Sequence, residues 1–306
     1  MNSLLRLLLK NQQKCRDSQE TQSSGGFTMV ELLVGMIMAF LILTPLFAFV
    51  IDILNNDRRE QTKAVSEQEV QAAIDFMAQD LQQAIYIYDQ AGINTIRNYL
   101  PEPGNTKRTP KLVFWKRQLV KDVLPVANCT ASATEDCLND TYVFSLVAYY
   151  VFTDKDTTWC QPDSAEGSCP QRIARYEVRD GVKDPTDSTK YLCDTITGGC
   201  PTASDIRKKD DAFNPKVDLT NPTNTTAPSQ PTLGANFKAP NILANYIFDF
   251  PAPVVTNNNL AKVSLIANAL RRSDTNATTC PTPPASPSAY CPTVTIQVQG
   301  RGGLGK

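Results

Sequence analysis

The segment from Leu32 to Ile51 contains no charged residue and, at about 20 residues, is long enough to cross a bilayer as a helix. Glu31 stands at its amino-terminal edge, and Gly25, Gly26 and Phe27 come shortly before it. A secretory signal carries its cleavage site after the apolar region, whereas the only site of that kind here comes before it. Cleavage between Gly26 and Phe27 would remove residues 1–26 as a leader and leave the apolar segment at the new amino terminus.

Glu31 is the chemically unusual residue of this junction. A charge held among apolar side chains costs several kcal/mol, as an order of magnitude, unless it is paired. After cleavage the Phe27 ammonium and the Glu31 carboxylate are four residues apart and share one helical face. We expect Glu31 to neutralise an amino-terminal amine, either its own or that of a neighbouring subunit. The alternative is an uncleaved signal anchor with a tolerated glutamate at the membrane interface.

The run from Gly26 through Phe27 to Glu31, followed directly by the apolar segment, resembles the prepilin signature of type IV pilins and type II secretion pseudopilins. In that family a prepilin peptidase cleaves after the glycine and methylates the new terminal amine. The resemblance implies that the peptidase and other pilins or pseudopilins are partners, and that Glu31 pairs with a neighbouring subunit. One departure is Gly25, which stands where many family members have a basic residue.

Pro45 lies inside the apolar segment, which we place at residues 27–54. It removes the hydrogen bond to the Leu41 carbonyl, so we expect the helix to kink or loosen there. Pilins often carry a helix-breaking proline in this region, which makes Pro45 a candidate assembly residue.

An amphipathic pattern follows the apolar segment over residues 55–92. Apolar residues recur at spacings of three and four and form one stripe: Val70, Ala73, Ile74, Met77, Leu81, Ala84, Ile85 and Tyr88. No proline or glycine interrupts the chain between Leu46 and Ala91. We expect one helix to continue to about residue 92 and to bury its stripe against a sheet.

Residues 93–306 read as a β-rich globular head. Strand patterns occur at 112–115, 141–152, 172–178, 246–250, 263–269 and 294–298. Between 183 and 240 the composition shifts to Thr, Asn, Asp and Pro, which indicates a polar surface insertion that is partly disordered. A long helix followed by hairpin-like strands predicts an α+β fold with a mainly antiparallel sheet. Together with the prepilin signature, this expected fold resembles that of type IV pilins.

The eight cysteines after residue 128 fall into four neighbouring pairs. These are Cys129 and Cys137, Cys160 and Cys169, Cys193 and Cys200, and Cys280 and Cys291. The basic leader favours the cytoplasmic side, so this part of the chain is expected outside the inner membrane, where disulfides form. Eight cysteines allow 105 connectivities, and nearest-neighbour pairing is the hypothesis that spacing favours. A zinc site is the alternative, although the chain has no C-x-x-C pattern.

The chain contains no histidine, which removes the commonest general base and the commonest metal ligand. A net charge of −1 without a basic, aromatic-rich patch argues against nucleic acid as a partner. Asp154 and Asp156 are weak candidates for a calcium site, and the G-x-G-x-x-G match at 300–305 lacks a following helix. We expect no enzymatic activity, no cofactor and no metal.

The run from Ile74 to Ala84, with its Asp80-Leu81-x-x-Ala84 core, is similar to larger minor pilins and pseudopilins. Over Gly25 to Arg117 the chain is similar to the hormogonium polysaccharide secretion pseudopilins of filamentous cyanobacteria. That resemblance implies a single-pass inner-membrane protein, its head in the periplasm or at the cell surface, which supports polysaccharide export linked to gliding motility. Membrane lipid and the exported polysaccharide are then further candidate partners. A tip adhesin or glycan-binding minor pilin, a type II secretion minor pseudopilin and a membrane-anchored enzyme are the alternatives.

Overall fold

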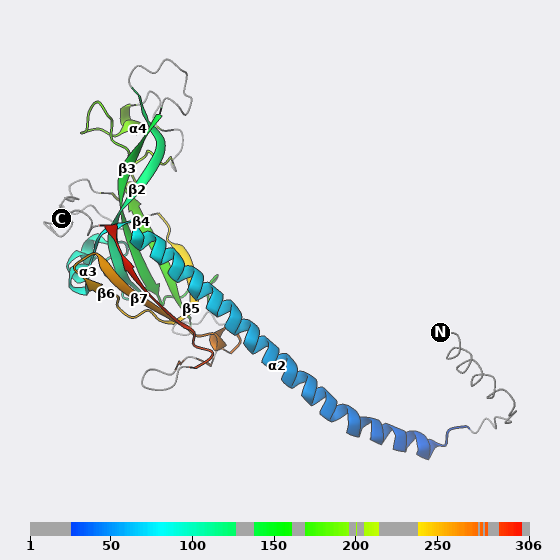
Figure 1. Ribbon diagram of the computed structural model, residues 1–306. Coiled ribbons are helices and arrows are strands. Elements are labelled where there is room, and N and C mark those ends of the chain that lie inside the picture. The colour runs from blue at the N-terminus through cyan, green and yellow to red at the C-terminus, as the bar shows by residue number, and fades with distance from the viewer. Residues whose placement is uncertain are drawn as a thin grey trace, which may run out of the picture. The chain divides into compact units, whose positions relative to one another are not determined.

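The computed structural model describes residues 26–126, 138–160, 169–195, 200, 205–213, 238–274, 276–277, 279–280 and 288–301. The chain separates into two compact units, residues 1–56 and 57–306. Helix α2 (Met29–Gln82) contributes residues to both units, and all the strands belong to the second one (Figure 1). The structure therefore has an α+β composition with a long amino-terminal helix, as the sequence predicts.

In the first unit, every described residue from 26 to 56 is exposed. Pro45 stands inside α2 without ending it. One turn is weakened by the missing amide hydrogen, and the Thr44 hydroxyl donates a hydrogen bond to the Phe40 carbonyl in the same region (2.7 Å). The helix is long enough for the flanking turns to keep it continuous.

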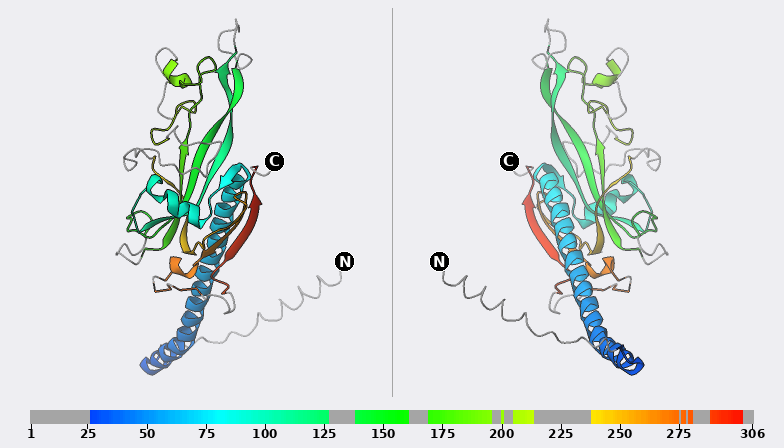
Figure 2. Two further views of the ribbon diagram at one scale, coloured as in Figure 1. Left: turned by 90° about the vertical axis from the view of Figure 1, so that its left-hand side faces the viewer. Right: turned by 90° about the vertical axis from the view of Figure 1, so that its right-hand side faces the viewer.

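In the second unit, α2 buries the face that the sequence predicts. Val70, Ile74, Met77 and Leu81 are completely buried. They pack on the sheet in one apolar core, and Figure 2 shows β8 (Thr293–Gln299) running beside this part of the helix. Stripe residues at spacings of three and four line up along one side of a helix, which is why this face meets the sheet.

The helix ends earlier than the sequence predicts. It stops at Gln82, and Ala84–Ile87 forms strand β1, antiparallel to β2 (Arg108–Pro125). Ile85 and Tyr88, the last predicted members of the helical stripe with Ala84, therefore leave it and pack on the opposite side of the sheet. Pairing with β2 satisfies the backbone groups of this segment, and β-branched and aromatic residues suit a strand. A long-range partner thus overrides the local helical pattern.

The described strands form one antiparallel sheet in the order β1-β2-β3-β4-β5-β7-β6, with β8 paired to β7. The remaining strands are β3 (Leu138–Phe152), β4 (Gln171–Arg179), β5 (Asn241–Asp249), β6 (Val254–Thr256) and β7 (Leu260–Ala267). Six of the eight described strands overlap the predicted strand patterns: β2, β3, β4, β5, β7 and β8. The predicted strand at 112–115 is much longer in the structure, and β1 and β6 are strands that the sequence reading missed.

The outer edge of β1 is joined to the turn between β6 and β7. The Ile87 amide donates to the Asn258 carbonyl (2.7 Å), and the Asn258 side chain donates to the Ile87 carbonyl (3.0 Å). The Gly300 amide donates to the Asn259 carbonyl (2.7 Å) beside this junction. These bonds cover a strand edge that would otherwise expose unpaired backbone groups.

Each face of the sheet carries its own apolar core, because side chains alternate along β2 and β3. Leu112, Phe114 and Tyr149 face α2, whereas Val113 and Trp115 face the opposite side. That opposite side is covered by the segment after β1. It contains α3 (Gln90–Ile96) and η2 (Arg97–Tyr99).

The described parts of the polar insertion are packed rather than loose. Leu192 lies in the short helix α4 (Leu192–Thr195) and is 4% exposed, in a small core with Val120 and Val143. Phe213 is also 4% exposed and meets Trp115 edge to face. A few apolar residues thus anchor this polar stretch to the sheet, a feature that average composition conceals.

Candidate functional site

The predicted processing junction lies at the start of α2. Gly26 and Phe27 precede the helix, Phe27 is 81% exposed, and the space around Gly26 is open. The Thr28 hydroxyl accepts a hydrogen bond from the Glu31 amide (3.2 Å). Thr28 therefore caps the helix, and Thr28-x-x-Glu31 has the residue pattern of a capping box. The bond between Gly26 and Phe27 is exposed directly before a capped helix.

Glu31 lies in the first turn of α2 with its side chain exposed. Among the described residues its carboxylate forms neither an ion pair nor a hydrogen bond. A negative charge at this position is favourable because the helix dipole is positive at its amino terminus. The carboxylate is thus accessible for the pairing with an amine that the sequence predicts, and that pairing stays a prediction.

The helix surface after this junction is apolar on all sides. Leu33, Phe40 and Phe47 are each more than half exposed, and the same holds for most large apolar residues of the segment. By length and composition, α2 is the one helix in the described part of the chain able to cross a membrane. A helix with apolar residues all around is suited to lipid or to packing among other helices.

A buried polar cluster joins α2 to the sheet in the second unit. Asp80 is 6% exposed and accepts hydrogen bonds from Lys116 (3.0 Å), Tyr149 (2.7 Å) and Arg175 (2.7 and 3.3 Å). Glu177 completes the cluster through ion pairs with Lys116 (3.1 Å) and Arg175 (2.8 Å). Two acids and two bases balance each other, so the burial of four charges is tolerated.

The ionisation of this cluster follows from its geometry. Burial opposes the charged form of Asp80, but the hydrogen bond and charge of Arg175, the charge of Lys116 and the Tyr149 hydroxyl outweigh it, so the pKa of Asp80 is lowered. The same balance of burial against Arg175 and Lys116 lowers the pKa of Glu177. Burial, with the Asp80 charge next, raises the pKa of Tyr149 well above its ordinary value. At neutral pH the carboxylates are charged and the phenol is neutral.

Asp80 belongs to the segment from Ile74 to Ala84 that is similar to minor pilins, but its sequence pattern did not predict this cluster. Asp80 lies three residues after Met77 and four before Ala84, and therefore on the buried stripe. An acid in the middle of an apolar face implies a buried cation partner. The sequence therefore contains evidence that Asp80 has a buried cationic partner, but it does not identify that partner.

The acidic residues named as calcium candidates have other partners. Asp154 accepts hydrogen bonds from Arg108 (2.7 and 3.0 Å) and from the nearly inaccessible Arg172 (2.7 Å). Asp156 accepts from the backbone amides of Thr158 and Trp159. Both carboxylates thus have structural roles, and Arg108 also pairs with Glu102 to extend the Asp154 cluster.

Three of the four predicted cysteine pairs are disulfides in the structure: Cys160–Cys169, Cys193–Cys200 and Cys280–Cys291. The pair Cys129 and Cys137 lies outside the described residues. Nearest-neighbour pairing is therefore confirmed wherever the structure describes the cysteines.

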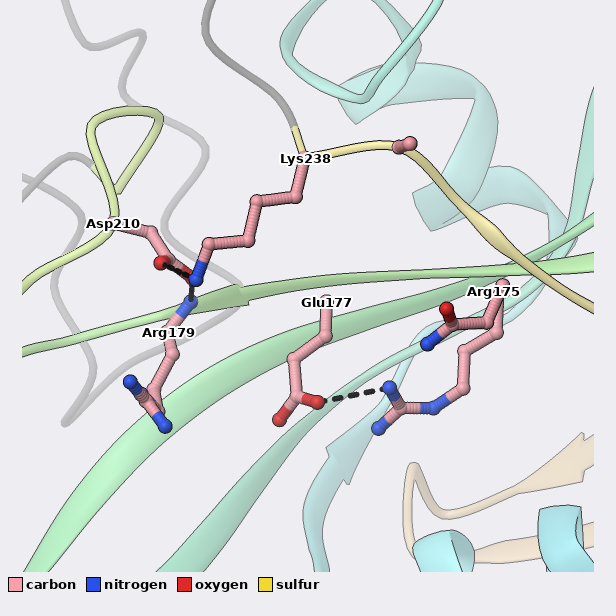
Figure 3. Close-up of a pocket in the computed structure, with 7 residues that line it drawn as sticks. Arg175, Glu177, Arg179, Asp210 and Lys238 are labelled. Carbon is pink, nitrogen blue, oxygen red and sulfur yellow. Dashed lines mark hydrogen bonds and ion pairs between the residues drawn. The ribbon is translucent and has the colours of Figure 1, made fainter. Parts of the chain in front are cut away.

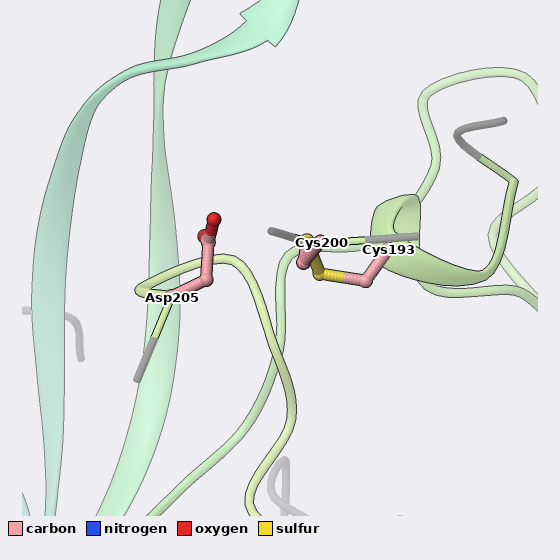
Figure 4. Close-up of side chains that lie close together, drawn as sticks. All are labelled: Cys193, Cys200 and Asp205. Carbon is pink, nitrogen blue, oxygen red and sulfur yellow. A yellow bond between two sulfur atoms is a disulfide. The ribbon is translucent and has the colours of Figure 1, made fainter. Parts of the chain in front are cut away.

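One group of possible metal ligands stands beside a disulfide. Cys193, Cys200 and Asp205 lie close together (Figure 4). The two sulfurs are bonded to each other, and Arg207 binds both oxygens of the Asp205 carboxylate (3.0 and 2.7 Å). A cysteine binds zinc through its thiolate, and a sulfur in a disulfide is not a thiolate. While Cys193 and Cys200 form a disulfide, this group therefore does not fit a metal ion.

The fold and these sites define an α+β protein with an apolar amino-terminal helix able to span a membrane and a disulfide-containing antiparallel sheet unit. No family model matches the chain, and neither a curated protein nor a solved structure is significantly similar to it.

Proposed function

We propose that the protein is a minor pseudopilin of a type IV pilus-like secretion system, with a structural role in filament assembly. In this proposal a prepilin peptidase cleaves after Gly26 and methylates Phe27, and the apolar helix passes from the inner membrane into a filament. The second unit faces outward, and the assembled filament supports polysaccharide export during gliding. The periplasmic or surface location of this unit is part of the proposal.

The observation that carries the proposal is the junction itself. An accessible glycine–phenylalanine bond directly precedes a capped helix, and that helix is apolar on all sides with one acid in its first turn. A membrane anchor alone gains from an acid at this place only the interaction with the helix dipole, worth about 0.3–1 kcal/mol. Because an unpaired charge is costly within an apolar assembly, Glu31 is explained by an amine partner that arrives with another subunit.

Amino-terminal sequencing of the membrane-extracted protein tests the processing step. We expect a chain that begins at methylated Phe27, and a variant with Gly26→Arg should keep its leader. A wild-type chain that begins at Met1 would refute the proposal.

Two glutamate variants separate the assembly role of Glu31 from a capping role. Glu31→Gln keeps the shape and the Thr28 cap but loses the charge, so we expect processing without assembly. Glu67→Gln, an exposed position on the second unit, is the matched control and should assemble normally. Equal incorporation of both variants into sheared filaments would contradict the assembly role.

The export role is tested in a deletion strain complemented with either variant. We expect loss of surface polysaccharide on deletion, restoration by Glu67→Gln and no restoration by Glu31→Gln. Normal export in the deletion strain would remove this part of the proposal and leave the processing result unaffected.

A further inference from the structure

A pocket of about 210 Å³ opens beside β4 in the second unit (Figure 3). It is far larger than a single water needs. Three cationic and two acidic side chains line it together with Ala239 and Asn241: Arg175, Arg179, Lys238, Glu177 and Asp210. The pocket is therefore polar, with one more positive than negative charge.

Most of these charges are already paired. Lys238 forms an ion pair with Asp210 (2.5 Å). Arg175 is shared between Glu177 (2.8 Å) and the buried Asp80 (2.7 Å). The excess positive charge of the pocket therefore belongs to Arg179.

Arg179 donates fewer side-chain hydrogen bonds to the described residues than its guanidinium can make. Within the described part of the chain its side chain makes a single hydrogen bond, from Nη2 to the Asp205 carbonyl at 3.3 Å, and its Nε is buried without an acceptor. The Asp205 carboxylate is not available, because Arg207 binds both of its oxygens. A buried guanidinium donor without an acceptor is unfavourable, and this arrangement calls for an anionic acceptor.

A second unpartnered group stands directly across the ladder from Arg179. Ser145 of β3 pairs with Arg179 in the strand register, and its completely buried hydroxyl has no partner among the described residues. Directly opposed residues in an antiparallel pair place their side chains on the same face of the sheet. Lys116 opposes Ser145 on the other side. A polar row of Lys116, Ser145 and Arg179 thus crosses three strands.

We propose that this pocket binds the carboxylate of an acidic sugar, with Arg179 as the main anchor. The planar guanidinium matches a carboxylate with two parallel hydrogen bonds. Glu177 and Asp210 in the lining disfavour a more highly charged anion such as phosphate. Asn241 also lines the pocket, and an amide side chain is suited to hydrogen bonds with sugar hydroxyls. The assignment to a glycan rests on the proposed role in polysaccharide export and names the chemical class of the cargo.

Titration of sodium glucuronate into the full-length protein in detergent micelles tests the proposal. We expect saturable binding with a Kd on the order of millimolar for one sugar unit, no saturation by glucose, and weaker binding of inorganic phosphate. Arg179→Gln should weaken glucuronate binding at least tenfold. Arg117→Gln is the matched control, because Arg117 is exposed, packs over the Tyr142 ring and does not line the pocket. The Kd of this variant should stay within twofold of wild type.

Arg179→Lys keeps the charge and decides the outcome if Arg179→Gln lowers the thermal midpoint. It should bind glucuronate, but more weakly than wild type because an ammonium lacks the planar fork. Absence of saturable glucuronate binding, tighter binding of phosphate, or equal losses in Arg179→Gln and Arg117→Gln would each overturn the proposal. A normal Phe27 amino terminus without glucuronate binding removes only the pocket assignment. A Met1 amino terminus with intact, Arg179-dependent binding removes only the pseudopilin assignment.

Discussion

Replacement of Asp80 by asparagine is the sharpest test of the buried cluster between α2 and the sheet. The carboxylate accepts four hydrogen bonds from Lys116, Tyr149 and Arg175. Asp80→Asn removes the charge and leaves two cations, 5% and 6% exposed, with Glu177 as the one acid of the cluster. Breaking a buried charge pair in this way costs about 3–5 kcal/mol.

Urea unfolding of the full-length protein in detergent micelles measures this cost. Trp115 is buried and donates to the Tyr88 hydroxyl (3.0 Å), so its fluorescence reports the packing of the sheet unit. With a slope of about 2–3 kcal/mol per molar urea, we expect the midpoint to fall by about 1–2.5 M. Asp75→Asn is the matched control, since Asp75 is exposed and bonded only to Gln71. It should change stability by less than about 0.5 kcal/mol.

A double variant separates lost pairing from lost packing. Lys116→Met combined with Asp80→Asn removes one charge of each sign, so it should destabilise by less than the sum of the two single changes. Equal midpoints for Asp80→Asn and Asp75→Asn would refute the reasoning. Strict additivity of Asp80→Asn and Lys116→Met would show that the two residues do not interact.

The same cluster predicts how stability depends on pH. The pKa values of Asp80 and Glu177 are lowered from ordinary values of 3.8 and 4.5. A lowered pKa means that the stabilisation is present above the unfolded pKa and is lost as pH falls through the folded pKa. The contribution of Asp80 and Glu177 to the unfolding free energy should therefore be constant above about pH 5 and should decrease below about pH 4. Asp80→Asn should flatten this acid loss.

Three further changes probe other parts of the second unit by the same urea assay. Cys160→Ser together with Cys169→Ser opens a loop with a sequence separation of 9 and should cost about 2–3 kcal/mol. Dithiothreitol should lower the urea midpoint of this double variant by less than it lowers the wild-type midpoint. Gly300→Ala places a methyl group 2.5 Å from a backbone oxygen of β1 and should cost about 1–3 kcal/mol; a wild-type midpoint would show that this junction yields easily. Phe114→Ala empties a fully buried position and should cost about 3–5 kcal/mol, whereas Leu119→Ala, 41% exposed, should cost under about 1 kcal/mol; similar losses for both would contradict the assigned core.

Local sequence patterns were sufficient to predict those structural features whose physical cause is itself local. The apolar segment before residue 52 defines a helix able to span a membrane, because its length and lack of charge need no partner to be recognised. The stripe from Val70 to Leu81 defines the buried face of that helix by periodicity alone. Cysteines with a sequence separation of 7 to 11 paired with their neighbours, because short loops bring them together at little entropic cost.

Tertiary structure decided every feature that depends on residues far apart in the chain. The helix ends at Gln82 because β2 offers a strand partner to the next residues, and nothing in the local pattern announces that partner. Asp80 meets Lys116 and Arg175 across separations of 36 and 95 residues, because α2 packs on the sheet where the strand register brings these two cations together. The same register places Ser145 opposite Arg179. Periodicity determines which face of an element is buried, whereas the chemistry of a buried site depends on how distant strands align.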